Sequence, residues 1–346
     1  MMMTAILKAP QKLVIEKMTE PECPSGGILI EVKACSICTT DAKMFYYGQR
    51  DLIYPRILGH EVTGVIVENK MGDPSFKIGD RVQIAPGISC GRCAFCQKGA
   101  TNKCDQIGIF GFTHHGGFAQ FLSVPPESIR CKGVNIIPDK LTFEQATLAE
   151  PLACCLNGQE RVGLDSGDTV LIFGAGPIGC LHAMAARTKG VSRIFLVERL
   201  QTRIEMARAV KADLLIDASE NIEPIIKRET KNRGVDVIIF ACSEFPTDYP
   251  ITDILAPRGR VCFFSGLPPE KTQIQFNGNT LHYNEMAFVG AYGCTSYQNK
   301  MALDLIASGE VSVDWLITKR ISLAQVREGI EYVAERRGMK VTITEF

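Results

Sequence analysis

The segment TVLIFGAGPIG (residues 169–179) restricts the fold of this chain more than any other stretch of it. A short apolar run is followed at once by Gly174, Gly176 and Gly179, and then by a long segment with helical spacing. The first glycine permits a tight turn, the second lets the backbone approach a ligand, and the third lets helix and strand pack closely. Free N–H groups at such a helix start bind phosphate. The segment therefore predicts a βαβ unit that binds a dinucleotide.

An acidic residue at the end of the next predicted strand supports this interpretation. Glu198 closes RIFLVE (residues 193–198), about 20 residues after Gly179, where an acid accepts hydrogen bonds from a ribose diol and repels a 2′-phosphate. We therefore expect NAD and not NADP, although Arg199 and Arg203 are basic neighbours that could host a phosphate. The residues expected to contact the cofactor are Gly174, Gly176, Pro177, Ile178, Gly179, Glu198, Arg203, Ser265 and Gly266.

The pattern of predicted elements changes along the chain. The first third holds short strands separated by turns, including residues 27–35, 61–68 and 81–85, which is typical of an all-β lobe. From residue 169 strands alternate with helices, which favours a parallel sheet covered by helices. The tail has two predicted helices and a last strand at residues 340–344, and it could return to the first lobe. A length of 346 residues fits two domains, and we expect an α/β fold.

Composition excludes some classes of function. Lys plus Arg equals Asp plus Glu at 38 each, so the chain has no electrostatic reason to hold nucleic acid or an anionic membrane. No apolar run approaches the ~20 residues of a membrane helix, and the start lacks the features of a signal peptide, so we expect a cytoplasmic protein. A non-catalytic zinc-binding regulatory protein is an alternative class of function. The charge balance and the dinucleotide fingerprint disfavour it.

Four of the fourteen cysteines form a cluster with metal-ligand spacing. The spacing is C-x2-C-x2-C-x7-C, and four thiolates around Zn²⁺ make a closed tetrahedral site that braces a loop. An iron–sulfur cluster is the alternative, but its fourth cysteine follows after three residues and precedes proline. The structural zinc ligands are therefore expected to be Cys90, Cys93, Cys96 and Cys104.

A second metal site is indicated by Cys38 and His60 together with an acid. Three protein ligands and an open position make a catalytic zinc site. The acid is open between two candidates. Glu61 adjoins His60 and could share the ion only if the backbone is irregular there, which Gly59 makes easier. Glu150 stands at the boundary between the two predicted lobes and could reach the same metal.

Taken together, these motifs resemble the zinc-containing medium-chain dehydrogenase/reductase family. The segments are GHEVTG (residues 59–64), the four-cysteine lobe, GGFAQF (residues 116–121), AEPLA (residues 149–153) and GAGPIG (residues 174–179). The carboxylate after the histidine and the EPL segment look like its polyol subgroup, which includes sorbitol (L-iditol), galactitol-phosphate, threonine and butanediol dehydrogenases.

The resemblance implies a fold and a ligand set. The fold is a Rossmann doubly wound parallel sheet (residues 149–289) inserted into a mainly-β GroES-like catalytic domain (residues 1–148 and 290–346). Cys38, His60 and Glu150 are implied as zinc ligands, with Glu61 as an alternating ligand or a neighbour of the site. The family also suggests a homodimer or homotetramer.

We expect a zinc- and NAD-dependent dehydrogenase that converts a secondary alcohol, of the polyol or sugar-alcohol class, to a ketone. Two zinc ions and one NAD are expected per chain. Zinc would lower the pKa of the alcohol, and Thr40 could pass the proton on.

A 3-hydroxy amino acid, a diol or a phosphorylated polyol are alternative substrates, and a zinc-free reductase of the same fold is a rival. His114 and His115 are either a solvated loop or contacts for a hydroxyl-rich substrate, and Phe118 is the expected pocket wall. The expected catalytic residues are Cys38, Thr40, His60, Glu61 and Glu150.

Overall fold

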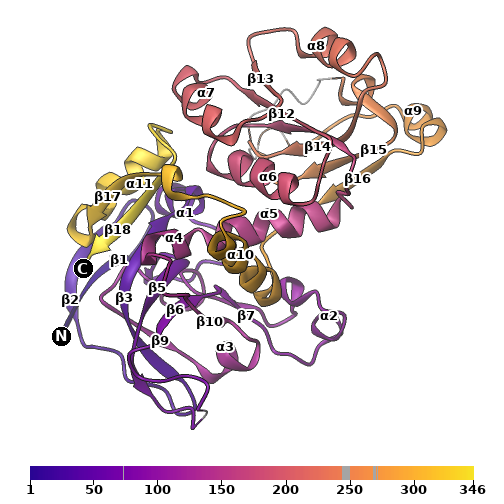
Figure 1. Ribbon diagram of the computed structural model, residues 1–346. Helices are drawn as coiled ribbons and strands as arrows, with labels where there is room; N and C mark the ends of the chain where they lie inside the picture. Colours follow the sequence, from indigo (N-terminus) through magenta and orange to yellow (C-terminus); the bar gives the residue numbers. More distant parts are fainter. Residues whose placement is uncertain (73, 244–249, 268–269, 271) are drawn as a thin grey trace. The chain divides into compact units, whose positions relative to one another are not determined.

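The chain folds into two compact units. The computed structural model describes residues 1–72, 74–243, 250–267, 270 and 272–346. Met1–Ala153 and Cys294–Phe346 form the first unit, and Cys154–Gly293 forms the second (Figure 1). None of the helices in the described part of the chain is long and apolar enough to cross a bilayer.

The first unit consists mainly of short β-strands. These are β1 (Met2–Leu7), β2 (Leu13–Met18), β3 (Ile28–Ile37), β4 (Arg56–Ile57), β5 (Glu61–Asn69), β6 (Arg81–Ile84), β7 (Gly87–Ile88), β8 (Gly108–Ile109), β9 (Phe121–Val124), β10 (Val134–Ile136), β17 (Ile317–Ser322) and β18 (Lys340–Glu345). The largest sheet has the order β10-β6-β5-β3-β18-β17, and β9 also pairs with β3. Smaller sheets of order β2-β1-β4 and β7-β8 complete the unit.

The last strand of the chain is a neighbour of one of the first. β18 pairs antiparallel with β3, so that Val341 lies opposite Ile37 and Ile343 opposite Cys35. Figure 1 shows this yellow strand against the indigo β3. All four side chains are buried, and β3 itself is buried along almost its whole length. The C-terminal segment is therefore part of the core of the first unit.

Short helices connect and cover these strands. The bounds are α1 (Thr39–Tyr47), α2 (Ala94–Gln97), α3 (Pro126–Arg130), α4 (Phe143–Thr147), α10 (Ser296–Ser308) and α11 (Val326–Ala334), with single 3-10 turns at Thr101–Lys103, Asp314–Leu316 and Leu323–Gln325. α11 packs against α1 and β18. α5 (Ala149–Arg161) carries the chain from the first unit into the second.

The second unit is a parallel sheet of six strands. They are β11 (Thr169–Phe173), β12 (Arg193–Glu198), β13 (Leu214–Asp217), β14 (Val235–Phe240), β15 (Leu255–Phe263) and β16 (Ala287–Gly290), with α6 (Pro177–Thr188), α7 (Gln201–Ala207), α8 (Ile222–Glu229) and α9 (Gly278–Tyr283) between them and single 3-10 turns at Arg208–Val210 and Ile251–Asp253. The strand order is β13-β12-β11-β14-β15-β16, and every pair is parallel. The order reverses between β11 and β14, where ligands of doubly wound sheets bind outside the carboxyl ends of the strands. The predicted Rossmann sheet is confirmed.

The core of the second unit contains a histidine without polar contacts from its ring. His182 of α6 is fully buried, and neither ring nitrogen has a hydrogen-bond partner among the described residues. Phe264 packs its edge against the imidazole, with the ring centroids 4.6 Å apart. Burial, and secondarily the positive charge of Lys189, lower the pKa of His182 to about 3. The ring is therefore held neutral in the folded protein.

This histidine makes stability sensitive to acid. In the unfolded chain the pKa of the imidazole returns to about 6.5, so the unfolded state takes up a proton below that pH and the folded state does not. Stability present above pH 6.5 is lost as the pH falls toward the folded pKa. We expect His182 alone to cost about 2 kcal/mol at pH 5 relative to neutral pH.

Urea unfolding at pH 7 and pH 5 measures this effect, and His182→Gln should show a smaller difference between the two pH values than the wild type. His282→Gln is the matched control, because His282 is exposed on α9. An equal pH dependence in the wild type and in His182→Gln would contradict the assignment.

Candidate active site

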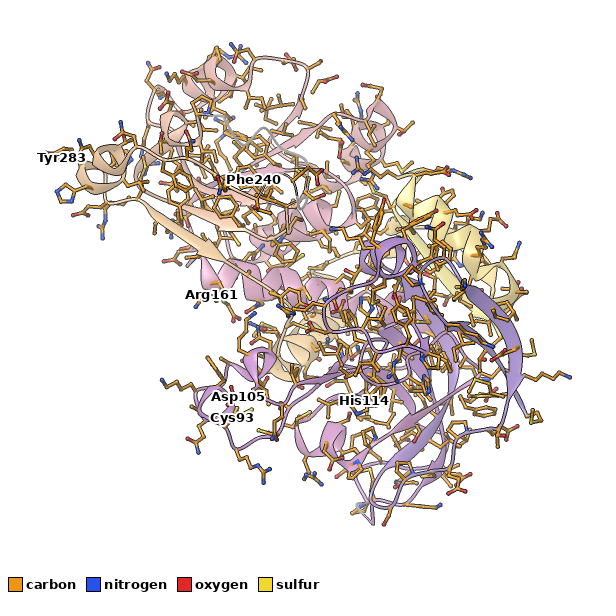
Figure 2. All side chains as sticks on the ribbon, turned by 180° about the vertical axis from the view of Figure 1, so that it is seen from behind. Cys93, Asp105, His114, Arg161, Phe240 and Tyr283 are labelled. Carbon is orange, nitrogen blue, oxygen red and sulfur yellow. The ribbon has the colours of Figure 1, made fainter. Side chains whose placement is uncertain are left out.

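The four predicted structural cysteines meet on one loop lobe. Their sulfur atoms all lie within 4.8 Å of one another, and α2 begins directly after Cys93. Cys104 Sγ accepts hydrogen bonds from the backbone N–H groups of Cys90, at 3.3 Å, and Gln106, at 3.4 Å. Figure 2 shows Cys93 beside Asp105 on this lobe. Four sulfur donors at this spacing fit a tetrahedral zinc ion.

The surroundings of the lobe favour the thiolate at two of its four cysteines, whereas burial disfavours it at Cys96 and Cys104. Backbone N–H groups of Arg92 and Cys93 lower the pKa of Cys90 to about 6. The backbone N–H groups of Cys96 and Asp105 also lower the pKa of Cys93. Burial, by contrast, raises the pKa of Cys96 to about 12. The thiolate is the form that binds a metal, so the two lowered values prepare the lobe for an ion.

The structure also brings together three residues of the second predicted metal site. Ligand atoms of Cys38, His60 and Glu61 lie within 4.8 Å of one another. Cys38 is the N-cap of α1, and His60 directly precedes β5, which begins at Glu61. Between β4 and β5 the backbone is irregular, because Gly59 has a φ of +89°. This irregularity is the condition under which adjacent residues can both face one ion.

A buried carboxylate behind the histidine was not singled out from the sequence. Asp41 is fully buried, and its Oδ2 accepts the backbone N–H of Cys38 at 2.8 Å. Its Oδ1 lies 3.4 Å from His60 Nδ1, an ion-pair distance without hydrogen-bond geometry. Burial is the largest single influence and opposes a charged imidazole, but the charge and hydrogen bonding of Asp41 and Cys38 together raise the pKa of His60 well above 6.5. Asp41 is thus placed to orient both Cys38 and His60.

A second such residue is Lys340 at the start of β18. Its ammonium group donates to Glu61 Oε1 although the two residues are 279 positions apart, and both side chains are almost completely buried. Burial opposes the charge of Lys340, but the negative charges of Glu61, Cys38 and Glu150 raise the pKa of Lys340 above its usual value. The other oxygen of Glu61, Oε2, has no hydrogen-bond partner among the described residues.

The remaining predicted residues occupy different places around this group. Glu150 is buried in the first turn of α5 and is not one of the three residues whose ligand atoms converge, although its charge acts on Lys340. Thr40 lies in the first turn of α1 and is half-buried. Phe118 is fully buried and would touch a Cβ at Gly59, so it packs below the backbone that leads to His60.

The two loop histidines lie beside this backbone as well. His115 Nδ1 accepts the backbone N–H of Ile57 at 3.2 Å, and His114 Nδ1 lies 3.0 Å from Thr113 Oγ1. Both imidazoles are exposed at the loop surface. His114 is labelled in Figure 2.

In the second unit, the predicted cofactor residues gather at the carboxyl ends of the strands. Gly174 has a φ of +95°, and a Cβ at Gly179 would collide with the carbonyl oxygen of Gly174. Gly176 is the N-cap of α6, and Pro177 and Ile178 are its first helical residues. Ser265 and Gly266 follow the end of β15, at the same edge of the sheet as this turn. The turn leaves room for a close ligand, as expected for a pyrophosphate.

Glu198 and Arg203 flank the turn with opposite charges. Glu198 is 7% exposed, and its carboxylate accepts three backbone N–H groups, those of Ala175 (3.0 Å), Arg199 (2.8 Å) and Leu200 (3.0 Å). The Arg203 guanidinium lies 3.0 Å from the position that a Cβ of Gly176 would occupy. The carboxylate therefore fixes the turn, while the guanidinium lies beside the backbone that a phosphate would approach.

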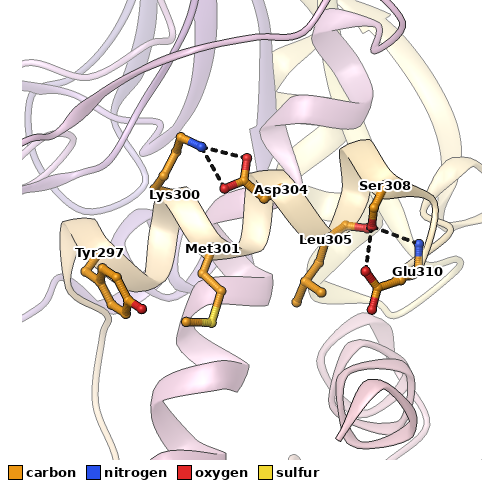
Figure 3. Close-up of a pocket in the computed structure, with 7 residues that line it drawn as sticks. All are labelled: Tyr297, Lys300, Met301, Asp304, Leu305, Ser308 and Glu310. Carbon is orange, nitrogen blue, oxygen red and sulfur yellow. Dashed lines mark hydrogen bonds and ion pairs between the residues drawn. The ribbon is translucent and has the colours of Figure 1, made fainter.

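A further hollow lies away from these residues. It has a volume of about 320 Å³ and runs along one side of α10 (Figure 3). Lys300 and Asp304 form an exposed ion pair there, and Ser308 contacts Glu310. None of the predicted zinc or cofactor residues lines it.

Comparison with known proteins identifies the family. Residues 24–132 match the alcohol dehydrogenase GroES-like domain, and residues 177–308 match the zinc-binding dehydrogenase domain. A sorbitol dehydrogenase of Bacillus subtilis is 31% identical over 343 residues, which cover 95% of this chain and 93% of the relative. The chain belongs to the zinc-binding alcohol dehydrogenase family.

Two other relatives extend this result. A D-arabitol-phosphate dehydrogenase of Enterococcus avium is 28% identical to this dehydrogenase over 94% of the chain and 92% of the relative. The crystal structure of a zinc-binding dehydrogenase from Sinorhizobium meliloti, bound to NADP, superposes with a TM-score of 0.90 at 30% identity and covers 99% of both chains. The predicted family, fold and zinc-dependent alcohol oxidoreduction are confirmed, as is a nicotinamide cofactor.

The buried pair of this dehydrogenase can be tested by its stability. Lys340→Met leaves Glu61 buried without its cation, and we expect a loss of about 3–5 kcal/mol in the free energy of unfolding. The double variant Lys340→Met, Glu61→Gln should recover part of that loss, because no charge is then left unpaired. Urea unfolding of the wild type, the single variants Lys340→Met and Glu61→Gln and the double variant measures both effects.

Lys300→Met is the matched control, because it breaks the exposed ion pair with Asp304 and should cost less than about 1 kcal/mol. Strictly additive losses in the double variant would show that Lys340 and Glu61 do not stabilise each other.

Proposed function

We propose that this dehydrogenase oxidises a secondary alcohol of the polyol or sugar-alcohol class to a ketone, with NAD as hydride acceptor. The proposal depends on one observation, the convergence of the ligand atoms of Cys38, His60 and Glu61 in a buried setting. The substrate class is supported by relatives named for sorbitol and D-arabitol phosphate.

The residues present fit a zinc ion at this place. A thiol, an imidazole and a carboxylate are the donors that catalytic zinc uses, and they leave a fourth position for substrate. We propose Cys38, His60 and one of the two buried carboxylates as the protein ligands. Glu61 converges with them and keeps Oε2 without a partner among the described residues, although its Oε1 is paired with Lys340, and Glu150 is the alternative carboxylate. Zinc, when bound there, acts as a Lewis acid that lowers the pKa of the alcohol.

Two further residues of the chain would orient the zinc ligands and move the proton, namely Asp41 and Thr40. Asp41 orients the imidazole of His60, and the backbone N–H of Cys38 that it accepts fixes the start of α1. Such a carboxylate behind a metal-bound histidine sets its tautomer and orientation. Thr40, the residue directly before Asp41, is half-buried and has a hydroxyl that can carry a proton away from the substrate.

A second zinc ion, with a structural role, is proposed for Cys90, Cys93, Cys96 and Cys104. Four thiols leave no open position, so this ion would hold the lobe together without taking part in the reaction. Two zinc ions per chain are therefore expected.

For the cofactor we propose NAD. Glu198 places a carboxylate against the glycine turn, and a 2′-phosphate would bring two further negative charges to it. One solved relative is bound to NADP, so the family fold does not by itself select NAD. In this chain the negative charge of Glu198 is what favours NAD. Arg203 beside Gly176 is suited to a phosphate of the pyrophosphate, which both cofactors share.

Glu198→Gln tests this choice. Loss of the negative charge should weaken discrimination against NADP about tenfold or more, with a smaller loss of NADH affinity, because the amide oxygen can still accept backbone N–H groups. Fluorescence titration of the protein with NADH and NADPH gives both dissociation constants. A ratio of the two constants that is unchanged from wild type would make Glu198 a purely structural residue.

Three further proposals concern the molecule as a whole. Residues 1–148 and 290–346 are proposed to act as the catalytic domain, and residues 149–289 as the nucleotide-binding domain. The fourteen cysteines form no disulfide in the described part of the chain, which suits a reducing compartment such as the cytoplasm. Among the described residues, the edge strand β16 has a partner strand on one side alone, and Tyr292 nearby is 46% exposed. An open edge favours association, so we propose a homodimer or homotetramer, which light scattering can test.

The main experiment is a screen of secondary alcohols with NAD, read as absorbance of the reduced cofactor. Polyols should be oxidised, whereas Cys38→Ser should have about one zinc per chain instead of two and no activity. Cys131→Ser is the matched control and should retain both, because Cys131 is a thiol outside the two clusters. Activity of zinc-depleted Cys38→Ser on a polyol would refute the scheme. A response confined to 3-hydroxy amino acids or simple diols would replace the substrate class and keep the chemistry.

A further inference from the structure

Arg56, at the start of the chain segment that leads to His60, has no carboxylate partner among the described residues. Arg56 opens β4, and its Nε donates to the carbonyl of Ile53 at 3.1 Å. Within the described residues no carboxylate lies at ion-pair distance from Arg56. Burial lowers the pKa of its guanidinium, which still remains charged at neutral pH. Most arginines of this chain form an ion pair with an acid. Arg56 is half-buried and forms none within the described residues, so its position needs an explanation.

Two imidazoles lie beside this arginine. His115 Nδ1 accepts the N–H of Ile57, the residue after Arg56, so in the neutral ring the proton must be on Nε2. Nε2 is then a hydrogen-bond donor, and no protein acceptor for it is found in the described part of the chain. His114 adjoins it, and its ring edge contacts Phe110, with centroids 6.1 Å apart.

The charges of these groups act on one another. Although both rings reach the surface, their partial desolvation, and then the charge of Arg56, lower the pKa of both His114 and His115. The one acid that offsets this at His114 is Glu127, which is itself paired with Arg130. The cluster is thus a place of positive potential that gains from a bound anion, because an anion would favour donors on all three side chains.

The cluster is joined to the catalytic residues by backbone contacts. Residues 57–59 and 116–118 run side by side, with hydrogen bonds from Gly116 N to Ile57 O (2.8 Å) and from Phe118 N to Leu58 O (3.0 Å). Phe112, two residues before His114, packs its ring edge on His60, with centroids 5.5 Å apart. Arg56 and His60 are four positions apart in the sequence, so their Cα atoms are at most about 14 Å apart.

We propose that Arg56, His114 and His115 form an oxyanion subsite beside the catalytic residues, and that the substrate is a polyol carrying a terminal carboxylate or phosphate. This inference rests on the proposed function and narrows its substrate class. An arginine with two imidazole donors suits either anion, since both present several acceptor oxygens on one atom. The hydroxyl that is oxidised would lie toward His60, with the anionic end of the same chain at Arg56. The D-arabitol-phosphate dehydrogenase among the relatives has a substrate of this chemical type by name.

The test compares three compounds with the same arrangement of hydroxyl groups: a neutral polyol, its terminal phosphate and the corresponding sugar acid. Wild-type protein loaded with zinc and NAD should show a higher kcat/KM for one of the two anions than for the neutral polyol. Arg56→Gln should lower kcat/KM for that anion about 10- to 100-fold and change the value for the neutral polyol by no more than about twofold. Arg56→Lys should restore part of the loss. Preference for the phosphate or for the sugar acid decides between the two anions.

Arg228→Gln is the matched control, because it removes one positive charge from the exposed face of α8 and should change none of these ratios. An equal loss for neutral and anionic compounds in Arg56→Gln, or a wild type that prefers the neutral polyol, would overturn the subsite while leaving polyol oxidation intact.

A second measurement does not depend on turnover. The chain has only five histidines, so their imidazole signals can be followed by NMR during titration with inorganic phosphate. Two of the five should shift in the wild type and in Arg228→Gln, and neither should shift at the same phosphate concentration in Arg56→Gln. If no polyol is oxidised but these shifts occur, the proposed function fails and the anion subsite stands. If no histidine signal responds, the subsite fails.

Discussion

The concentration of buried carboxylates around Cys38 and His60 is the constraint on which the catalytic unit depends. Asp41 and Glu61 are fully buried and Glu150 nearly so. A buried charge without a partner costs several kcal/mol, so the fold must bring positive charge to this place. Lys340 does so from the last strand of the chain, and its pairing with Glu61 explains why β18 must lie beside β3. The return of the C-terminal segment is therefore an electrostatic requirement as well as a means of burying apolar side chains.

This constraint also shows where inference from sequence ends. The strands of the Rossmann sheet and the four-cysteine lobe could be predicted, because each is encoded by residues close together in the chain. Lys340 could not, since its partner Glu61 lies 279 residues away and a lysine at a strand start carries no local signal. Asp41 is an intermediate case. Its spacing of three from Cys38 is that of a capping pair at a helix start, a signal that was present but not used.

The choice between Glu61 and Glu150 is another point that spacing alone left open. Adjacent residues of a strand face opposite ways, but His60 lies just before β5 and follows Gly59, whose φ is +89°, and the ligand atoms of His60 and Glu61 lie within 4.8 Å of one another. That conformation is visible in the structure, whereas a glycine in a sequence indicates only that it is permitted. The pairing with Lys340 weakens Glu61 Oε1 as a donor to a metal ion, whereas Oε2 has no hydrogen-bond partner among the described residues, so both Glu61 and Glu150 stay candidates for the carboxylate ligand.

The second unit must also match charge, but here the groups to be matched belong to the bound cofactor. A dinucleotide brings a pyrophosphate that needs positive charge and, in NAD, a ribose diol that needs an acceptor. Glu198 and Arg203 supply the two from either end of the turn between β12 and α7, and the glycine turn lies between them. Because the carboxylate of Glu198 also accepts three backbone N–H groups, it cannot move away to make room for a 2′-phosphate without leaving those donors unsatisfied. The same hydrogen bonds that hold the turn in shape therefore keep the negative charge in place, and this fixed charge is the physical basis of the NAD preference proposed for the chain.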